Sequence, residues 1–333
     1  MPNRLISSIM PQLRMYSDSN DTYKFFFEFA KALQDEGGEL AAKPEDVQNL
    51  VYVSFYLAVK NWKRKPSGGI HYRYFSHSPH DSIYINASRV NELAETLVSA
   101  NQLALLQQLF LSLIKDNEEI ETKYTNILVP VVPSLVRILK ERNIALDSEH
   151  CKFFFRWLIE NYLQSILGRM TSDISQFYIR KLGCGSERCT DCQILDNFIM
   201  STQESYEFRE VQERRRHLED QLDMAPDMVT HHTDTNGRPY GLIVTKRWEI
   251  IDAINWILRQ EAAVEFLKPF EGGDMERLLG RRFPDVEKAL SGEKTYVAGT
   301  HSLPVSVANP LGSGSSTAST RHAGSGVNRN RST

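Results

Sequence analysis

The sequence predicts a mainly α-helical protein, built as an array of helical hairpins or as an irregular bundle and followed by a small module with a β-hairpin. Three observations support this fold class. Apolar residues recur at three- and four-residue spacing through successive segments of residues 19–180. Three cysteines then lie close together, at Cys184, Cys189 and Cys192. Beyond them, an Asn-Gly pair at residues 236–237 separates two strand-like segments.

The composition is that of an ordinary soluble protein. The chain has 333 residues, of which 41% are hydrophobic and 24% charged, and a formal net charge of −3. A net charge so close to zero gives no global reason to expect a nucleic-acid partner. The first residues lack the apolar core of a signal peptide, and no apolar run reaches the roughly 18 residues of a membrane span. We therefore expect an intracellular protein, cytoplasmic or nuclear, that makes no use of a membrane.

The expected helices follow one another with short connections. The segment 19–38 has cap residues at its start and a Gly pair at its end. The segment 43–65 begins with Pro44 and acidic residues and ends in Lys and Arg, which suits the helix dipole. Two prolines are expected to kink or split the helix over 118–143. The remaining helices are expected over 88–117, 148–170, 207–224 and 247–270, with one or two short ones over 272–293.

These elements predict three regions. Residues 1–180 form a helical scaffold domain. Residues 181–292 form the module with the cysteines, the β-hairpin and packing helices, and the hairpin is expected within 229–246, closed by a two-residue type I′ turn. Residues 293–333 are rich in Ser, Gly and Arg, and we expect this tail to have no fixed structure.

The cysteine cluster carries most of the chemistry in the sequence. Its spacing is Cys184-x4-Cys189-x2-Cys192, and a C-x2-C pair forms a compact knuckle for a metal ion. Disulfides need an oxidising compartment, and a redox C-x2-C pair normally begins a helix beside a βαβ pattern that is absent here. Three unprotected structural cysteines on a polar loop are the remaining alternative. The favoured interpretation is a structural zinc site with four tetrahedral ligands, so the module is predicted to be zinc-stabilised.

A histidine is the expected fourth ligand. Cys151 lies on an apolar helix and is expected to pack in the core. His217, on the charged helix after the cluster, is the favoured candidate. His231 or His232 in the first hairpin strand are alternatives, as are Cys151 itself and the lack of a fourth protein ligand. The predicted metal ligands are Cys184, Cys189, Cys192 and His217.

The order of parts over residues 180–250 also resembles a known family. A cysteine-rich segment, an Arg-x-His-Leu-Glu helix and a strand ending in Val-Thr-Lys resemble the C-terminal module of large, mostly uncharacterised fungal proteins. Those proteins carry a 2-oxoglutarate and iron dependent oxygenase-like domain upstream. The resemblance implies the accessory half of such a protein without its catalytic half. The matching positions are Cys189, Cys192, Leu195, Arg215, His217, Leu218, Glu219, Pro239, Leu242, Val244, Thr245 and Lys246, with Cys184 as a looser match.

An iron site of the oxygenase kind would need a His-x-Asp pair and a distal histidine on a β-rich core. His232 and Asp234 fit the short pattern, and His301 fits the distal position. The intervening residues 247–291 have a helical pattern, however. We therefore expect no oxygenase site, and a remnant of such a protein is the third interpretation of the chain.

Two basic clusters raise the possibility of nucleic-acid contact. Basic residues interleaved with aromatic ones can bind phosphates and stack on bases. A helix end that simply carries Lys and Arg, and a salt-bridged face with acidic residues, are the favoured interpretations. The first cluster comprises Lys60, Lys63, Arg64, Lys65 and Arg73 with Trp62, Tyr72 and Tyr74, and the second comprises Arg214, Arg215 and Arg216 with Arg209 upstream.

Together these features favour a non-enzymatic protein. The expected role is a binding or scaffolding module for a protein partner, with a structural zinc ion and no evident small-molecule substrate. The first alternative is a nucleic-acid-binding protein that uses the zinc module and its Arg-rich helix.

Overall fold

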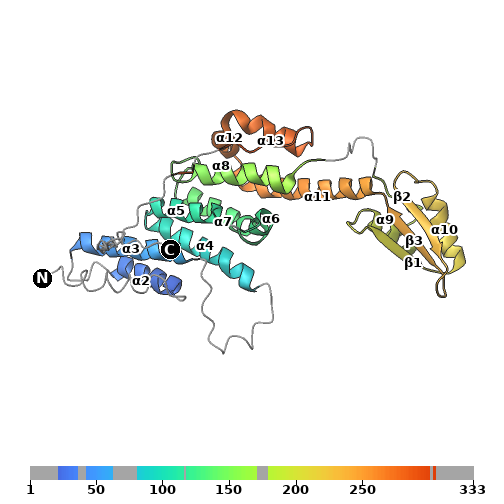
Figure 1. Cartoon of the computed structure of the whole chain (residues 1–333), viewed down its shortest axis with the longest axis horizontal. Helices are drawn as coiled ribbons and strands as arrows, with labels where there is room; N and C mark the ends of the chain where they lie inside the picture. Colours follow the sequence, from blue (N-terminus) through green and yellow to red (C-terminus); the bar gives the residue numbers. More distant parts are fainter. Residues whose placement is uncertain are drawn as a thin grey trace, which may run out of the picture. The chain divides into compact units, whose positions relative to one another are not determined.

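The structure is a computed structural model that describes residues 22–36, 43–62, 81–115, 118–170, 179–300 and 303–304. The described residues up to 62 belong to one compact unit and those from 81 to 304 to a second. Residue 180, the predicted domain boundary, lies within the second unit. The predicted fold class is confirmed, because the described chain is mainly helical and contains a small antiparallel sheet (Figure 1).

The first unit is a helical hairpin. α2 (Thr22–Glu36) and α3 (Pro44–Asn61) pack against each other, as their amphipathic patterns predict. In the aromatic run of α2, Phe26 and Phe27 are buried, whereas Phe25 remains about half exposed. The burial of Phe26, Phe27 and Phe55 removes three large apolar side chains from water and stabilises the pair.

The second unit begins with two helices where the sequence predicted one. α4 (Asp81–Ser99) and α5 (Leu103–Ile114) are separated at Asn101, whose φ of 54° is left-handed. The Gln102 amide donates to the Leu97 carbonyl and the Asn101 amide to Val98, which is the Schellman pattern of a helix end. Asparagine tolerates the left-handed conformation, so Asn101 can end the first helix. The apolar spacing that predicted one helix contains no sign of this break.

The proline-containing segment forms a continuous helical run rather than two separate helices. It consists of α6 (Ile120–Lys123), the π-helical turn η3 (Tyr124–Leu128) and α7 (Val129–Glu141). Pro130 and Pro133 have no amide hydrogen to donate, and the wider hydrogen bonding lies directly before them. α4 packs against α7 and η3.

An aromatic cluster joins the next helices to the C-terminal ones. α8 (Lys152–Asn161) continues into the π-helical turn η4 (Tyr162–Leu167), and α11 (Trp248–Leu267) packs against η4. Tyr162 stacks on Phe266 of α11 with ring centroids 4.0 Å apart, and the Tyr124 hydroxyl donates to the Leu158 carbonyl. The short helices that follow α11 are η6 (Lys268–Phe270), α12 (Asp274–Leu279), η7 (Gly280–Arg282) and α13 (Phe283–Leu290).

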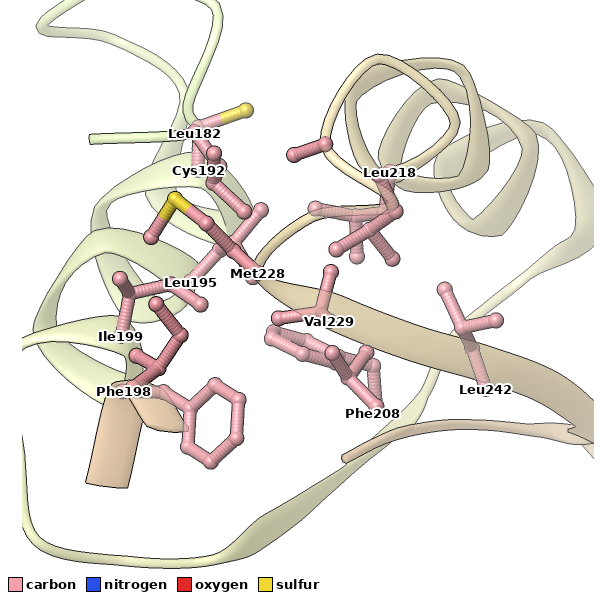
Figure 2. Packing of buried hydrophobic residues seen from close by; sticks show 14 of the residues in the cluster. Leu182, Cys192, Leu195, Phe198, Ile199, Phe208, Leu218, Met228, Val229 and Leu242 are labelled. Carbon is pink, nitrogen blue, oxygen red and sulfur yellow. The ribbon is translucent and has the colours of Figure 1, made fainter. Parts of the chain in front are cut away.

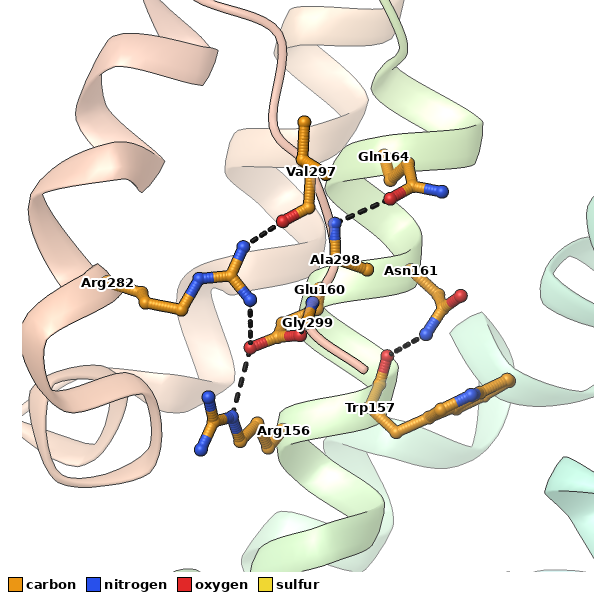
Figure 3. Close-up of polar contacts among 9 residues, drawn as sticks. All are labelled: Arg156, Trp157, Glu160, Asn161, Gln164, Arg282, Val297, Ala298 and Gly299. Atoms are coloured by element: carbon orange, nitrogen blue, oxygen red, sulfur yellow. Dashed lines mark hydrogen bonds and ion pairs between the residues drawn. The ribbon is translucent and has the colours of Figure 1, made fainter. Parts of the chain in front are cut away.

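The first part of the predicted unstructured tail is ordered, which corrects the prediction for residues 293–299. Tyr296 is 2% exposed, and the next three residues are fixed by side chains of α8, η4 and η7 (Figure 3). The Ala298 amide donates to Gln164 and the Gly299 amide to the buried carboxylate of Glu160. The sequence missed this segment because buried tyrosine and backbone groups, rather than apolar periodicity, hold it in place.

A three-stranded antiparallel sheet forms the centre of the cysteine-containing module. Its strand order is β1 (Ser205–Arg209), β3 (Gly241–Lys246) and β2 (Val229–Asp234). The β2–β3 hairpin is confirmed, but Asp234 pairs with Gly241, so six residues close it instead of two. The register of these pairs centres the loop between Gly237 and Arg238, so Asn236-Gly237 is not the central pair of the turn, and Pro239 cannot donate a ladder hydrogen bond.

The predicted helix over 207–224 is wrong in its first residues. Residues 207–209 belong to β1, and α10 spans Gln212–Leu222. Phe208 is buried and its two strand neighbours are exposed, which is the alternation of a strand with one covered face. The alternation covers only a few residues of a charged segment whose overall pattern is helical, so the sequence favoured a helix there.

One apolar core connects the sheet to its two helices. α9 (Thr190–Ile199) contributes Leu195 and Phe198, and α10 contributes Leu218 (Figure 2). Phe208 and Leu242 come from the sheet, and Cys192 belongs to the same core. The N-terminal part of α11 also packs here. The module therefore has a core of its own, which positions the cysteines.

Candidate metal centre

The four predicted ligands meet at one point. The Sγ atoms of Cys184, Cys189 and Cys192 and a ring nitrogen of His217 all lie within 4.8 Å of one another. The Nε2 atom of His217 is 3.3 Å from the Cys192 sulfur and 3.6 Å from the Cys189 sulfur. Such a group could hold a metal ion. Sequence spacing thus identified a set of residues that the fold brings together from three segments.

Two of the cysteines are positioned by the start of α9. Cys189 is the N-cap residue and Cys192 lies in the first turn, so both sulfurs are near the positive end of the helix dipole. Cys192 is buried, whereas Cys184 is exposed. The cluster therefore spans the edge of the core, with one ligand in the interior and one in contact with solvent.

Cys184 is held in place by its neighbours in the chain. The Oδ1 atom of Asp196 accepts hydrogen bonds from the Leu182 and Gly183 amides, each at 2.8 Å. A Cβ atom at Gly183 would lie 2.9 Å from the Cys192 Cβ, so only glycine allows this close approach. The segment before Cys184 is in this way fastened to α9.

α10 is fixed against α9 by an ion pair. Arg214 binds the carboxylate of Asp191 through two of its nitrogens, and its Nε lies 2.7 Å from Asp191 Oδ2. Asp191 is the residue before Cys192 and is 5% exposed, and Arg214 precedes His217 by one helical turn. The pair therefore sets the distance between the C-x2-C knuckle and the histidine.

The cysteines differ in their proton affinity. A hydrogen bond from the Ser186 backbone, with further ones from Cys192 and His217, lowers the pKa of Cys184 to about 7. Burial raises the pKa of Cys192 to about 12. A metal ion binds thiolates, so binding at Cys192 requires the release of a proton that the protein otherwise retains. A bound cation would compensate the cost of burying that thiolate.

The alternative ligands do not join the cluster. His231 lies on β2, with its Nε2 3.0 Å from Asp223 Oδ1, and His232 is exposed on the same strand. Cys151 is fully buried, as expected of a packing residue, and burial raises the pKa of its thiol. Among the described residues, the group of possible metal ligands is the predicted set with His217.

The proposed iron ligands can be placed only in part. His232 and Asp234 both lie on β2, and most of the residues from 247 to 291 are helical as predicted. His301 lies outside the described residues. An oxygenase iron site would need a distal histidine beside His232 and Asp234, and the described residues do not include the candidate His301.

The Arg-rich helix has the salt-bridged character that the sequence favours. Arg214 pairs with Asp191 and with Glu210, and Arg215 is buried. Arg216 remains exposed. Of the first basic cluster, the structure describes Lys60, which is exposed, and Trp62, which is buried, and the other members lie outside the described residues.

The residues that position the ligands were not predicted from the sequence. Asp191, Asp196 and Gly183 have no metal-binding pattern of their own, and their roles follow from hydrogen bonds and close approach. The one available signal is their place within or next to the cysteine cluster. The spacing of the cysteines does not predict a role for Asp191, which lies inside the C-x2-C pair, or for Gly183, which precedes Cys184.

A comparison of the chain with protein-family models, with curated proteins and with solved structures found no match. The resemblance to the fungal oxygenase-like proteins stays a prediction. Within the described residues, no helix has the length and apolar character needed to cross a membrane.

Proposed function

We propose that this chain is a non-catalytic binding or scaffolding protein whose module, residues 181–246, is stabilised by a structural zinc ion. The observation that carries the proposal is the convergence of three cysteine sulfurs and one histidine nitrogen within 4.8 Å. Three thiolates and an imidazole are a common ligand set for structural zinc.

Two of the distances among the ligand atoms fit a tetrahedral ion of zinc's size. With a Zn–S bond of about 2.3 Å and a Zn–N bond of about 2.0 Å, a tetrahedron separates S and N by about 3.5 Å. The two sulfur distances from His217 Nε2 are 3.3 and 3.6 Å. Soft thiolates with an imidazole favour zinc over magnesium, calcium or manganese, which prefer oxygen ligands.

A structural role follows from the number of ligands. Catalytic zinc sites usually have three protein ligands and keep a position for water, whereas four protein ligands complete the tetrahedron. The ion would link three segments: the one before α9, which carries Cys184, the start of α9 itself, and α10. Because these segments meet only in the folded chain, the binding free energy of the metal becomes folding free energy.

A binding role is supported by large apolar side chains that remain in solvent on and beside the module. Their residue types, methionine, tryptophan and tyrosine, are enriched at protein interfaces. A protein partner is therefore the proposed partner class. The exposed side chains are Met200, Val211, Met224, Tyr240 and Trp248.

Nucleic-acid binding receives less support from the contacts of the arginines. Arg214 is engaged by Asp191 and Glu210, and Arg215 is 8% exposed and lines a cavity, so neither forms part of an open basic surface for a phosphate backbone. Salt-dependent binding of the chain to nucleic acid at low ionic strength, lost on neutralising Arg216, would favour this alternative over ours.

Metal analysis tests the proposal directly. The purified full chain is expected to contain about one zinc per chain. Replacing both Cys189 and Cys192 by serine should remove the zinc and lower the thermal stability. Cys151→Ala is the matched control, because it removes a thiol outside the cluster and should leave the zinc content unchanged. Unchanged zinc content and stability in the double variant would contradict the proposal.

A further inference from the structure

Arg215 is a buried cation in the module. It lies on α10 and is 8% exposed, and its Nε donates to the Glu210 carbonyl at 3.1 Å. The ring of Tyr240 lies over the guanidinium, with 5.5 Å between the ring centroid and Cζ. These two contacts leave both terminal nitrogens of the guanidinium available as donors.

No carboxylate of the described residues is within ion-pair distance of Arg215. Its neighbour Arg214 is paired with two carboxylates. Glu219, one helical turn further along α10, instead accepts a hydrogen bond from the Thr233 hydroxyl at 3.1 Å. Buried charges in proteins are normally paired, because an unpaired one loses its hydration without compensation. The side chain as a whole is 8% exposed, but its terminal nitrogens still reach solvent, so a partner from outside the chain can pair with them.

A surface cavity adjoins the guanidinium. It has a volume of about 320 Å³ and lies between α10 and the β2–β3 hairpin. Hydroxyl and amide groups line it together with the arginine, and these can donate hydrogen bonds to an oxyanion. The lining residues are Gln212, Arg215, Glu219, Thr233, Thr235 and Tyr240.

We propose that this cavity binds the carboxylate of an anionic ligand, with the two terminal nitrogens of Arg215 as its main donors. The planar guanidinium presents paired N–H groups that match the two oxygens of a carboxylate. Tyr240 holds the guanidinium plane from one side, and Thr235 lines the hairpin side of the cavity, whereas the Thr233 hydroxyl already donates to Glu219.

The charge of the cavity favours a monoanion over a dianion. Arg215 contributes one positive charge and Glu219 one negative charge to its lining. A dianionic phosphate would therefore enter a cavity without excess positive charge, next to a carboxylate that repels it. A carboxylate carries half of the charge of that phosphate and is repelled less by Glu219. The ligand can be a free small acid or an acidic side chain of a partner, and the two share this chemistry.

This inference deepens the proposed binding function but does not depend on the zinc ion, because no metal ligand lines the cavity. The test uses the full chain labelled with ¹⁵N-arginine and follows the side-chain Nε–H resonances. Sodium acetate, N-acetylglutamic acid α-amide and inorganic phosphate are titrated separately, with sodium chloride at matched ionic strength as the blank. Metal content is measured on each sample, so a failure of the zinc site is seen independently.

The expected result is a saturable shift of the Arg215 resonance with both carboxylates and a weaker one with phosphate. A tighter response to the blocked glutamate than to acetate would identify a side chain of a partner as the source. Arg215→Lys keeps the charge but loses the planar fork, and should weaken binding by at least about tenfold. Calorimetric titration measures this affinity, because the variant has no Arg215 resonance. Arg216→Gln is the matched control, since it removes an exposed charge from the same helix and should bind as the unmodified chain does.

Three results would overturn the inference. One is the lack of a saturable shift with either carboxylate in the unmodified chain. Another is an equal affinity in Arg215→Lys. The third is a tighter response to phosphate than to both carboxylates, which would replace the assigned ligand class. The unmodified chain supplies the first and third readouts, so the inference stays testable even if a variant fails to fold.

Discussion

Replacing Asp196 by alanine is expected to weaken metal binding while leaving all four ligands in place. Its Oδ1 atom accepts the amides of Leu182 and Gly183, directly before Cys184. Without the carboxylate, this segment loses its attachment to α9, and the Cys184 sulfur no longer has a fixed position. Metal binding would then have to order the segment before Cys184, and the free energy spent on this ordering lowers the affinity for the metal.

The magnitude follows from the two hydrogen bonds. Bonds to a charged group contribute about 1.5–3 kcal/mol each, so the full loss is at least about 3 kcal/mol. Part of that is recovered, because water can bind the freed amides once the segment moves. Residues that orient metal ligands typically change metal affinity by about 10–100-fold, or about 1.4–2.8 kcal/mol. We expect a loss in this range.

The assay is competition for zinc with a chromophoric chelator, using the full chain. Asp220→Ala is the matched control, because Asp220 is an exposed aspartate on α10 and its replacement changes the net charge equally. Asp196→Asn keeps an oxygen acceptor and should fall between the two. If Asp196→Ala binds zinc as tightly as Asp220→Ala, Asp196 does not position Cys184.

Two further predictions concern stability. Tyr296→Ala removes a buried ring and should lower the free energy of unfolding by about 3 kcal/mol in denaturant titrations, whereas Val297→Ala at its exposed neighbour should change little. Equal effects would show that the ordered tail segment is not fixed by Tyr296. Burial lowers the pKa of Lys246 from 10.5 to about 8, so between these values the unfolded chain binds more protons than the folded one. The stability of the unmodified chain relative to Lys246→Met should therefore rise with pH across this window, by up to about 3 kcal/mol, in thermal melts at a series of pH values. A difference that is flat with pH would contradict this assignment.

The ligand set could be predicted from sequence because it depends on residue chemistry and local spacing. A C-x2-C pair forms a knuckle in any suitable turn, and few histidines follow it in the chain. Cys151 could be set aside because its surroundings are apolar. His217 could be favoured over His231 and His232, but spacing could not decide among the three, because the position of His217 depends on how α10 packs on α9.

Other features depended on contacts that no local pattern encodes. β1 consists of five residues in a charged segment, and it becomes a strand because Phe208 can enter the core beside Leu242. The helix break at Asn101 depends on a single left-handed residue. The ordered segment after residue 293 depends on the buried Glu160, whose carboxylate accepts a backbone amide far along the chain.

α10 shows how several of these features share one short helix. Successive residues are rotated by about 100° around a helix, so neighbours in the sequence face different parts of the protein. Arg214 faces Asp191 on α9, Arg215 the cavity beside the hairpin, and His217 the cysteines. Leu218 enters the core. Leu218 and Leu222 form its buried face, so the rotation of the helix is fixed by this apolar packing together with the ion pair. The core packing and the ion pair also orient Arg215 toward the cavity, so this orientation does not require the metal ion.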